Sequence, residues 1–221
     1  MATCHRTTAE AMARLDGTTE IERALIQALE QRYQSDEVVS KEEFKAWNDD
    51  YSAAMKVVYE AFPDDLDVSC LYAEAMINRT PWQLWDLKLR EPAEGADTIE
   101  AMQVLERAIA LAEERGKEPH PGLLHIYIHV MEMSPFPEKA LKAGDVLRTL
   151  VPDAGHLVHM PTHIDVLCGQ YQNVVHWNQK AIEADLKYYA REGAYNSCAG
   201  YRLHDYHFII YGALFLGQIA P

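Results

Sequence analysis

The sequence predicts an all-α protein built of paired helices. Successive segments place apolar residues at the three-and-four spacing that gathers them on one face of a helix. No stretch alternates apolar and polar residues with period two for long enough to predict a strand. Histidines also recur 34 residues apart, because His125 and His129 are followed by His159 and His163. A period of this length in paired helices indicates a helical solenoid.

Length and charge restrict the partners of the chain. Its 221 residues suffice for one sizeable core or one short repeat array. The 34 acidic and 20 basic residues give a formal net charge of −14, which argues against binding to nucleic acid or to an anionic membrane surface. No apolar run approaches the roughly 18–20 residues of a spanning helix. A small-molecule substrate is the expected partner.

The cysteines and the N-terminus predict a cytoplasmic protein. No apolar segment near the N-terminus has the character of a secretory signal. The cysteines are scattered without a CxxC spacing, which favours packing roles in a reduced setting over a thiolate metal site. They are Cys4, Cys70, Cys168 and Cys198.

The first part of the chain is expected to be irregular. Residues 1–18 lack periodicity and are expected to form a loose arm. Residues 19–119 then hold irregular helical repeats, with amphipathic helices at about 19–33, 41–62 and 66–79.

The middle of the chain contains the first linker. Pro81 is expected to open a short helical turn, with Trp82 and Trp85 as core anchors. Residues 87–97 are polar and form a linker, and a strong helix follows at 98–115.

The last part of the chain is expected to hold two regular helix pairs, an insertion and a final helix. The pairs lie at about 121–133 with 137–150, and at 155–168 with 172–190. Pro161 lies inside a predicted helix, where it removes a backbone hydrogen bond and bends the segment. Residues 187–203 are an insertion of roughly 14 residues beyond a repeat length. A final helix follows at 204–218.

The repeat resembles the tetratricopeptide (TPR) family. Residues 167–171, Leu-Cys-Gly-Gln-Tyr, resemble its inter-helix turn, and Pro152 stands where its closing proline belongs. The resemblance is clear over 120–186 and partial at 98–114 and 203–218. More narrowly, the chain resembles a group of generally longer microbial repeat proteins with the blocks HPG…HxYIH, GHLVHMPxH and HDxH. The resemblance implies a TPR-like helix–turn–helix solenoid with irregular N-terminal helices, forming a single repeat domain.

The resemblance also implies that the histidines line a groove. In TPR proteins the first helix of each pair faces the concave side. That rule places seven histidines and one carboxylate on groove-facing positions of three neighbouring helices. They are His125, His129, Glu132, His156, His159, His163, His204 and His207, with Tyr211 one turn further on.

Such a cluster favours a metal site. Several imidazolium ions close together would repel one another, so most rings must be neutral. Each neutral ring presents one bare nitrogen, and a metal ion satisfies several such nitrogens at once. Nearby groups that could orient the rings through the other nitrogen are Tyr127, Asp165, Asp205, Tyr206 and Tyr211. The alternative is a polar groove of neutral histidines without a metal.

The first functional hypothesis is a metal-dependent oxidase or oxygenase acting on a small organic molecule. The predicted metal ligands are His125, His129, His159, His163 and His207. The groups expected to complete the coordination sphere, orient rings or move protons are Glu132, His156, His204 and Tyr211. Imidazole-rich sites favour copper or iron first, with zinc as the alternative. Seven histidines exceed the need of one zinc ion, so the centre is expected to be mononuclear with acid–base histidines or dinuclear.

Two other functions stay open. A TPR scaffold could bind a partner peptide, but lysine and arginine are absent from 121–134, 155–169 and 203–221, which disfavours clamping of a carboxylate. A metal-dependent hydrolase needs a carboxylate base, and Glu132 or Asp165 could supply one.

Two further hypotheses concern the C-terminal part. The insertion, with Tyr188, Tyr189, Tyr195 and Tyr201, could fold over the groove as an aromatic lid. The final helix has no following helix to cover it, so its apolar residues are expected to promote homo-oligomer formation. These residues are Phe208, Ile209, Leu214 and Phe215.

Overall fold

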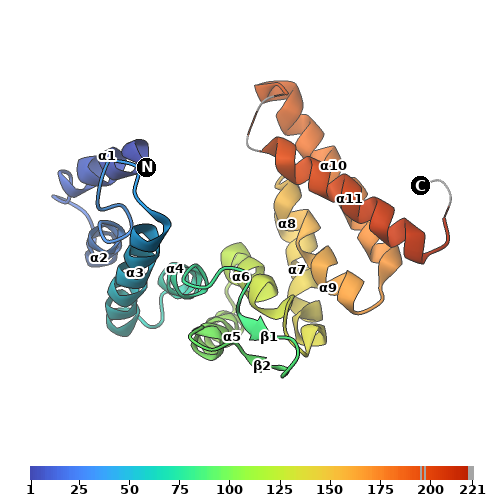
Figure 1. Cartoon of the computed structure of the whole chain (residues 1–221), viewed down its shortest axis with the longest axis horizontal. Helices are drawn as coiled ribbons and strands as arrows, with labels where there is room; N and C mark the ends of the chain where they lie inside the picture. The colour runs from blue at the N-terminus through green and yellow to red at the C-terminus, as the bar shows by residue number, and fades with distance from the viewer. Residues whose placement is uncertain (195, 197, 219–221) are drawn as a thin grey trace. The chain divides into compact units, whose positions relative to one another are not determined.

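The computed structural model describes residues 1–194, 196 and 198–218, and Figure 1 traces the chain. In this part of the chain the fold is helical apart from one pair of two-residue strands, so the all-α prediction is confirmed. The chain forms two compact units. The single repeat domain stays a prediction. Unit 1 comprises Met1–Asp86 and Pro92–Glu114, and unit 2 comprises Leu87–Glu91 and Arg115–Pro221.

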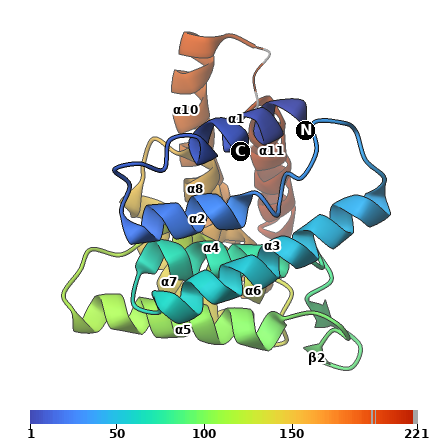
Figure 2. The same cartoon turned by 90° about the vertical axis from the view of Figure 1, so that its left-hand side faces the viewer.

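Unit 1 is a stack of helices in chain order. They are α1 (Ala2–Met12), α2 (Glu20–Leu29), α3 (Lys41–Ala61), α4 (Leu66–Ile77) and α5 (Thr98–Glu114). Each packs on the next, and Figure 2 shows α2, α3 and α5 of this unit. Thr19, Ser40 and Asp65 cap α2, α3 and α4, since each side chain accepts a hydrogen bond from the backbone N–H three residues on. These caps explain why the predicted starts of the three helices hold.

The prediction of a loose arm at residues 1–18 is wrong, because residues 2–12 form α1. The hydroxyls of Thr7 and Thr8 donate to carbonyls four residues earlier, within the helix. His5 Nδ1 lies 2.7 Å from the Tyr33 carbonyl oxygen, which ties the helix to the segment after α2. The helix therefore depends on a tertiary contact that its weak apolar pattern did not reveal.

The predicted helical turn at Trp82 and Trp85 is also wrong. The strands β1 (Trp85–Asp86) and β2 (Glu91–Pro92) pair there in a two-stranded sheet. Arg90 has a φ of 60°, which lets the chain reverse within a few residues. Trp85 is buried as expected, but Trp82 is 79% exposed and is no core anchor. Strands this short are below the length at which alternation can be recognised.

Unit 2 contains the remaining helices. They are α6 (Pro121–Met131), η1 (Pro137–Ala140), α7 (Leu141–Leu150), α8 (Gly155–His159), α9 (Pro161–Leu167), α10 (Tyr171–Glu192) and α11 (Cys198–Phe215). α6 packs on α7, both α8 and α9 pack on α10, and α11 lies along α10 (Figure 1). The core includes Ile128, Met131 and Leu147, which are fully buried.

Pro161 divides the predicted helix 155–168 into α8 and α9, which confirms the predicted interruption. The hydroxyl of Thr162 donates to the His159 carbonyl oxygen at 2.7 Å. That bond satisfies a carbonyl at the break, where the helical ladder is interrupted.

The predicted insertion 187–203 is largely helical. α10 continues to Glu192 and α11 begins at Cys198, six residues before the predicted start of the final helix. Tyr188 and Tyr189 therefore lie on α10, and Tyr201 lies on α11. Tyr195 lies outside the described residues, so the lid hypothesis rests on Tyr201, which packs against His156 with ring centroids 4.7 Å apart.

Gly155 lets α8 approach α10 closely. A Cβ at this position would lie 2.2 Å from Asp185 Oδ1 and 2.8 Å from the Ala181 carbonyl oxygen. We expect Gly155→Ala to lower the free energy of unfolding by about 1–3 kcal/mol, because backbone must move to admit the methyl group. Gly200→Ala on α11 has open space and is expected to raise stability by about 0.5–1 kcal/mol. Urea denaturation of both variants checks this, and equal changes would contradict it.

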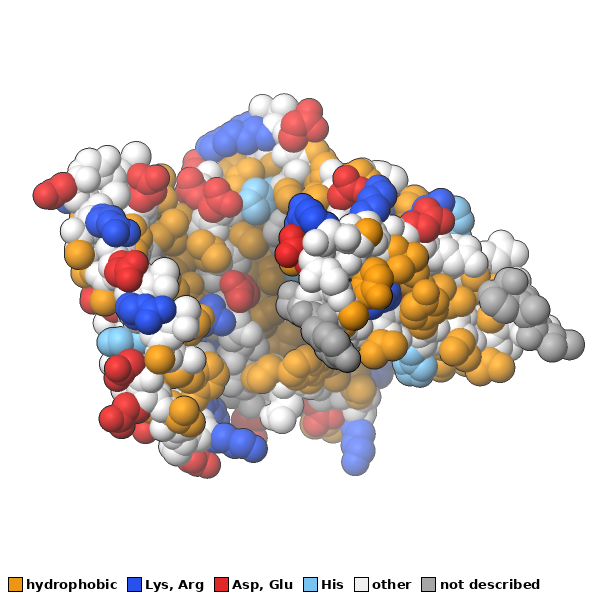
Figure 3. Space-filling model, turned by 90° about the horizontal axis from the view of Figure 1, so that it is seen from above, with side chains coloured by type: hydrophobic (Ala, Val, Ile, Leu, Met, Phe, Trp, Pro, Cys, Tyr) orange, Lys and Arg blue, Asp and Glu red, His pale blue; other side chains and the backbone are white. Residues whose placement is uncertain are grey.

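The solvent-facing side of α11 is apolar. Leu203, Ile210 and Leu214 are 60–70% exposed, and hydrophobic side chains crowd the right-hand part of Figure 3. Ile209, in contrast, is buried. Homo-oligomer formation through α11 stays a prediction, and a monomer in sedimentation at micromolar concentration would contradict it. Among the described residues, no helix has both the length and the apolar character required to cross a bilayer.

Candidate metal centre

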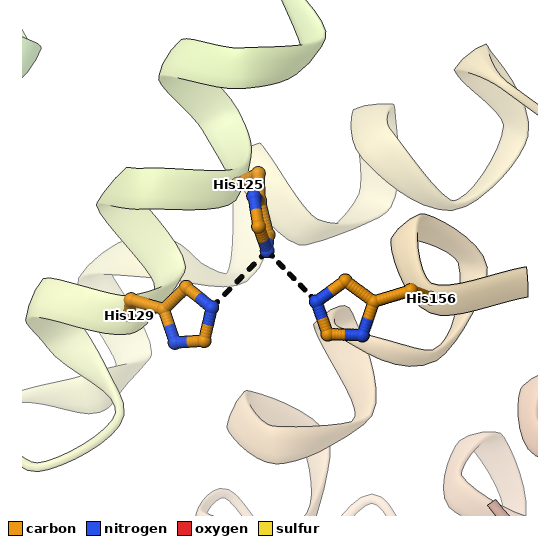
Figure 4. Close-up of side chains that lie close together, drawn as sticks. All are labelled: His125, His129 and His156. Atoms are coloured by element: carbon orange, nitrogen blue, oxygen red, sulfur yellow. Dashed lines mark hydrogen bonds between the residues drawn. The ribbon is translucent and has the colours of Figure 1, made fainter. Parts of the chain in front are cut away.

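Three histidines from two helices bring their Nε2 atoms together. His125 and His129 lie one turn apart on α6, and His156 lies on α8 (Figure 4). Nε2 of His125 is 3.1 Å from Nε2 of His129 and 3.1 Å from Nε2 of His156. Two nitrogens bound to one tetrahedral zinc ion at ~2.0–2.1 Å lie about 3.3–3.4 Å apart. We name this group triad 1, and its geometry could hold one metal ion.

A second group repeats this arrangement. His159 lies at the end of α8, His163 lies on α9, and His204 lies on α11. Nε2 of His159 is 2.9 Å from Nε2 of His163, and candidate ligand atoms of all three rings lie within 4.8 Å of one another. Phe208 packs against each of these rings, with centroids 4.6–4.9 Å apart. We name this group triad 2, and it too could hold one metal ion.

Hydrogen bonds to the other ring nitrogens determine where the protons of triad 2 lie. Asn178 donates through Nδ2 to the hydroxyl of Thr162 and to the Val174 carbonyl, so its Oδ1 faces His159. His159 Nδ1 therefore donates to Asn178 Oδ1 at 2.6 Å. When its ring is neutral, its Nε2 is bare and presents a lone pair.

Glu132 plays the same part for one ring of each triad. It follows the last residue of α6, and its Oε1 is 2.9 Å from His129 Nδ1 while its Oε2 is 2.6 Å from His163 Nδ1. An ionised carboxylate only accepts hydrogen bonds, so both Nδ1 atoms carry the proton. When both rings are neutral, the bare Nε2 atoms of His159 and His163 face each other at 2.9 Å. A cation at this point satisfies both lone pairs.

Burial sets the charge of these groups. Desolvation, reinforced by neighbouring imidazoles, lowers the pKa of His125 to about 3, of His156 to about 4 and of His159 to about 3. It also lowers the pKa of His204. Burial raises the pKa of Glu132, but hydrogen bonds from His129 and His163 outweigh it and bring the pKa to about 2. Near neutral pH, His125, His156 and His159 are therefore neutral, and Glu132 is ionised.

These shifts predict acid sensitivity of the metal-free protein. A histidine in the unfolded chain has a pKa near 6.5. Below this pH the unfolded chain therefore binds protons that the buried neutral rings of the folded protein do not bind. The free energy of unfolding consequently falls as the pH is lowered toward about 3–4. The free energy of unfolding of the wild-type chain is expected to decrease between about pH 7.5 and pH 5. In His125→Gln we expect this decrease to be smaller by on the order of 1–2 kcal/mol. Urea denaturation at both pH values measures this. His176→Gln, at an exposed ring beside Trp177, should leave the loss unchanged.

Four of the five predicted metal ligands lie in the two triads, and the fifth does not. These four are His125, His129, His159 and His163. His156 and His204, which were predicted to complete the coordination sphere or to move protons, are the third members. His207 is exposed and lies in neither triad.

Two other predicted roles also change. Tyr211, which was expected to orient a ring or to move protons, is 43% exposed and packs against Phe215. Asp165 is fully buried and paired with Arg148, with N–O distances of 2.9 and 3.2 Å, so it orients no histidine.

Asp205, which was predicted to orient a ring, lies near His159 of triad 2. It is fully buried, and its Oδ1 is 3.1 Å from His159 Nδ1 without hydrogen-bonding geometry. Desolvation and the nearby Asp185 raise its pKa to about 8, so near neutral pH it is mostly protonated. Asn178 is thus the stronger partner of His159.

Asn178, Thr162 and Phe208 were not predicted from the sequence. An asparagine in an amphipathic helix and a phenylalanine in an apolar one carry no local signal for a metal site. One signal for His204 was present: His156 and His204 are 48 residues apart, as are His159 and His207. His156 and His204 play equivalent parts, because each completes a triad with two histidines four residues apart, whereas His207 has no part equivalent to that of His159.

The two triads are therefore a repeated unit: a one-turn pair of histidines and a third ring from the next helix in the array. No model of a protein family, no curated protein and no solved structure matches this chain.

Proposed function

We propose that this chain is a metal-dependent oxidoreductase, an oxidase or oxygenase of a small organic molecule, with a dinuclear copper centre. His125, His129 and His156 hold one ion, and His159, His163 and His204 hold the other. The observation that carries the proposal is the 2.9 Å separation of the Nε2 atoms of His159 and His163. Both atoms are bare when the rings are neutral, because the Nδ1 atoms donate to Asn178 and Glu132. A cation removes the repulsion between their lone pairs.

The donor set favours copper. All six candidate ligands are imidazoles, which suit copper, zinc, iron and nickel, whereas thiolates are absent from both triads. Non-haem iron sites of the open type need a carboxylate ligand, and both oxygens of Glu132 are already engaged by His129 and His163. Bound copper would supply one-electron transfer and reactivity toward dioxygen. Three protein ligands per ion leave positions free for small molecules.

The protein groups around the triads define the approach of a substrate. His204 is exposed, and Tyr201, which is 48% exposed, packs against His156. A small organic molecule can therefore reach the ring of His204 from solvent. Glu132 accepts from Nδ1 of His129 and of His163, so their Nε2 atoms would be free to bind the ions.

The hydrolytic alternative has weaker support. It requires a carboxylate base beside a metal-bound water, and both candidates are engaged elsewhere. Glu132 accepts from two rings, and Asp165 is paired with Arg148 in the core.

We also propose a TPR-like solenoid for residues 120–186. α6 begins at Pro121 and α8 at Gly155, 34 residues apart, and each first helix packs with a following second helix, α7 or α10. The short links between them agree with a repeat of helix pairs.

Metal loading with a turnover assay tests the function. The full chain is loaded with copper, its metal content is determined, and oxygen consumption is followed with ascorbate or catechol as electron donor. We expect two copper ions per chain and oxygen uptake that the double variant His125→Ala/His204→Ala lacks. The proposal would be contradicted by a chain that binds zinc stoichiometrically but does not bind copper. A copper-loaded chain that consumes no oxygen would contradict it as well.

A further inference from the structure

Glu132 joins the two triads through a single carboxylate. Its Oε1 accepts from His129 of triad 1 at 2.9 Å, and its Oε2 accepts from His163 of triad 2 at 2.6 Å. The side chain is 14% exposed, so water competes little for these oxygens. Its backbone N–H donates to the Ile128 carbonyl oxygen at 2.8 Å, which anchors it to α6.

Each of these bonds prepares a ligand. A neutral ring whose Nδ1–H donates to the carboxylate presents a bare Nε2, the atom that points into its triad. In triad 1, Nε2 of His129 is 3.1 Å from Nε2 of His125, and in triad 2, Nε2 of His163 is 2.9 Å from Nε2 of His159. One side chain therefore sets the tautomer and orientation of one ligand in both triads.

We infer that Glu132 couples the two triads, so that a metal ion bound in one increases the affinity of the other. This inference rests on the proposed metal centre. An ion on His129 Nε2 makes its Nδ1–H a stronger donor and holds the Glu132 carboxylate in place. Oε2 is then already positioned for His163, and the second ion binds without the entropic cost of ordering that ring.

Two electrostatic effects act on this coupling in opposite directions. Two cations repel each other, which alone would make the second ion bind more weakly. The Glu132 carboxylate carries a negative charge between the two coordinated rings and attracts both ions. Because the carboxylate contacts one ring of each triad directly, its effect on ordering and on charge reaches both sites at once.

A second route between the triads exists along the backbone. His156 of triad 1 and His159 of triad 2 lie three residues apart on α8, with ring centroids 6.2 Å apart. A substitution of Glu132 leaves this route intact. It therefore separates coupling through the carboxylate from coupling through α8.

Glu132→Gln is the decisive variant because it keeps the shape of the side chain. The amide oxygen accepts from one ring, but the amide nitrogen donates and requires a bare Nδ1 on the other ring. That ring then carries its proton on Nε2, where it blocks a metal ion. Glu138→Gln, an exposed glutamate six residues further on, is the matched control.

Two measurements on the full chain test the coupling. Calorimetric titration with zinc, which is redox-inert, gives the affinities of the two ions. In the wild-type chain, we expect the second zinc ion to bind at least about tenfold more tightly than it would to independent sites. In Glu132→Gln, we expect this cooperativity to be lost and the affinity for zinc to be about 10–100-fold lower. Nitrogen NMR of the metal-free protein should show Nδ1–H on both His129 and His163, and one change of tautomer in the variant.

The outcomes separate the inference from the proposed function. Independent zinc sites in the wild-type chain, cooperativity that survives in Glu132→Gln, or unchanged tautomers in that variant would each overturn the coupling while leaving a metal centre in place. Failure of the wild-type chain to bind zinc or copper would overturn the proposed function, and the coupling with it. Glu138→Gln should behave as the wild type in every measurement.

Discussion

Replacing His204 with alanine is expected to remove one of the two metal ions, whereas replacing His207 is expected to remove none. Both rings lie on α11, three residues apart, and both are exposed. Only His204 reaches triad 2, where its ring lies 4.8 Å from His159 and 5.6 Å from His163 between centroids. Loss of a direct ligand should weaken that site by more than the 10–100-fold typical of an orienting group.

Metal analysis and zinc titration of the two variants decide between them. Because neither side chain is buried, both variants should keep the wild-type stability. One ion per chain in His204→Ala and two in His207→Ala is the expected result. The reverse pattern would restore His207 as the ligand that the repeat register predicts.

Replacing Arg148 with methionine is expected to lower the free energy of unfolding by roughly 3–5 kcal/mol, the cost of leaving a buried charge unpaired. Arg148 is 4% exposed, and it donates to both oxygens of the fully buried Asp165. Burial raises the pKa of Asp165 even with this partner present. Without the guanidinium, the carboxylate must bind a proton or lose its burial.

Urea denaturation measures this effect, and two further variants interpret it. Lys180→Met removes an exposed ion pair with Glu183 and should change stability by less than about 0.5 kcal/mol. The double variant Arg148→Met/Asp165→Leu should recover most of the loss, because neither partner is left charged and unpaired. A loss below about 1 kcal/mol in Arg148→Met would show that this pair contributes little to the core of unit 2.

Local sequence patterns were sufficient for most helices. The start of α4 follows from a cap at Asp65, and the break between α8 and α9 follows from Pro161, because both effects act within one helical turn. The pairs His125–His129 and His159–His163 follow from the four-residue spacing that places two rings on one face. α1 was missed because its stability comes from packing and from the contact of His5 with the Tyr33 carbonyl.

The third histidine of each triad was decided by tertiary structure. Sequence spacing shows that His204 and His207 lie on one helix, but which of them meets α8 depends on the position and rotation of α11 along α10. The same holds for Glu132, whose two partners belong to different helices, and for Asn178, which carries no local signal. Patterns of three and four residues determine what a single helix presents, whereas meeting points between helices depend on packing angles that no single segment encodes.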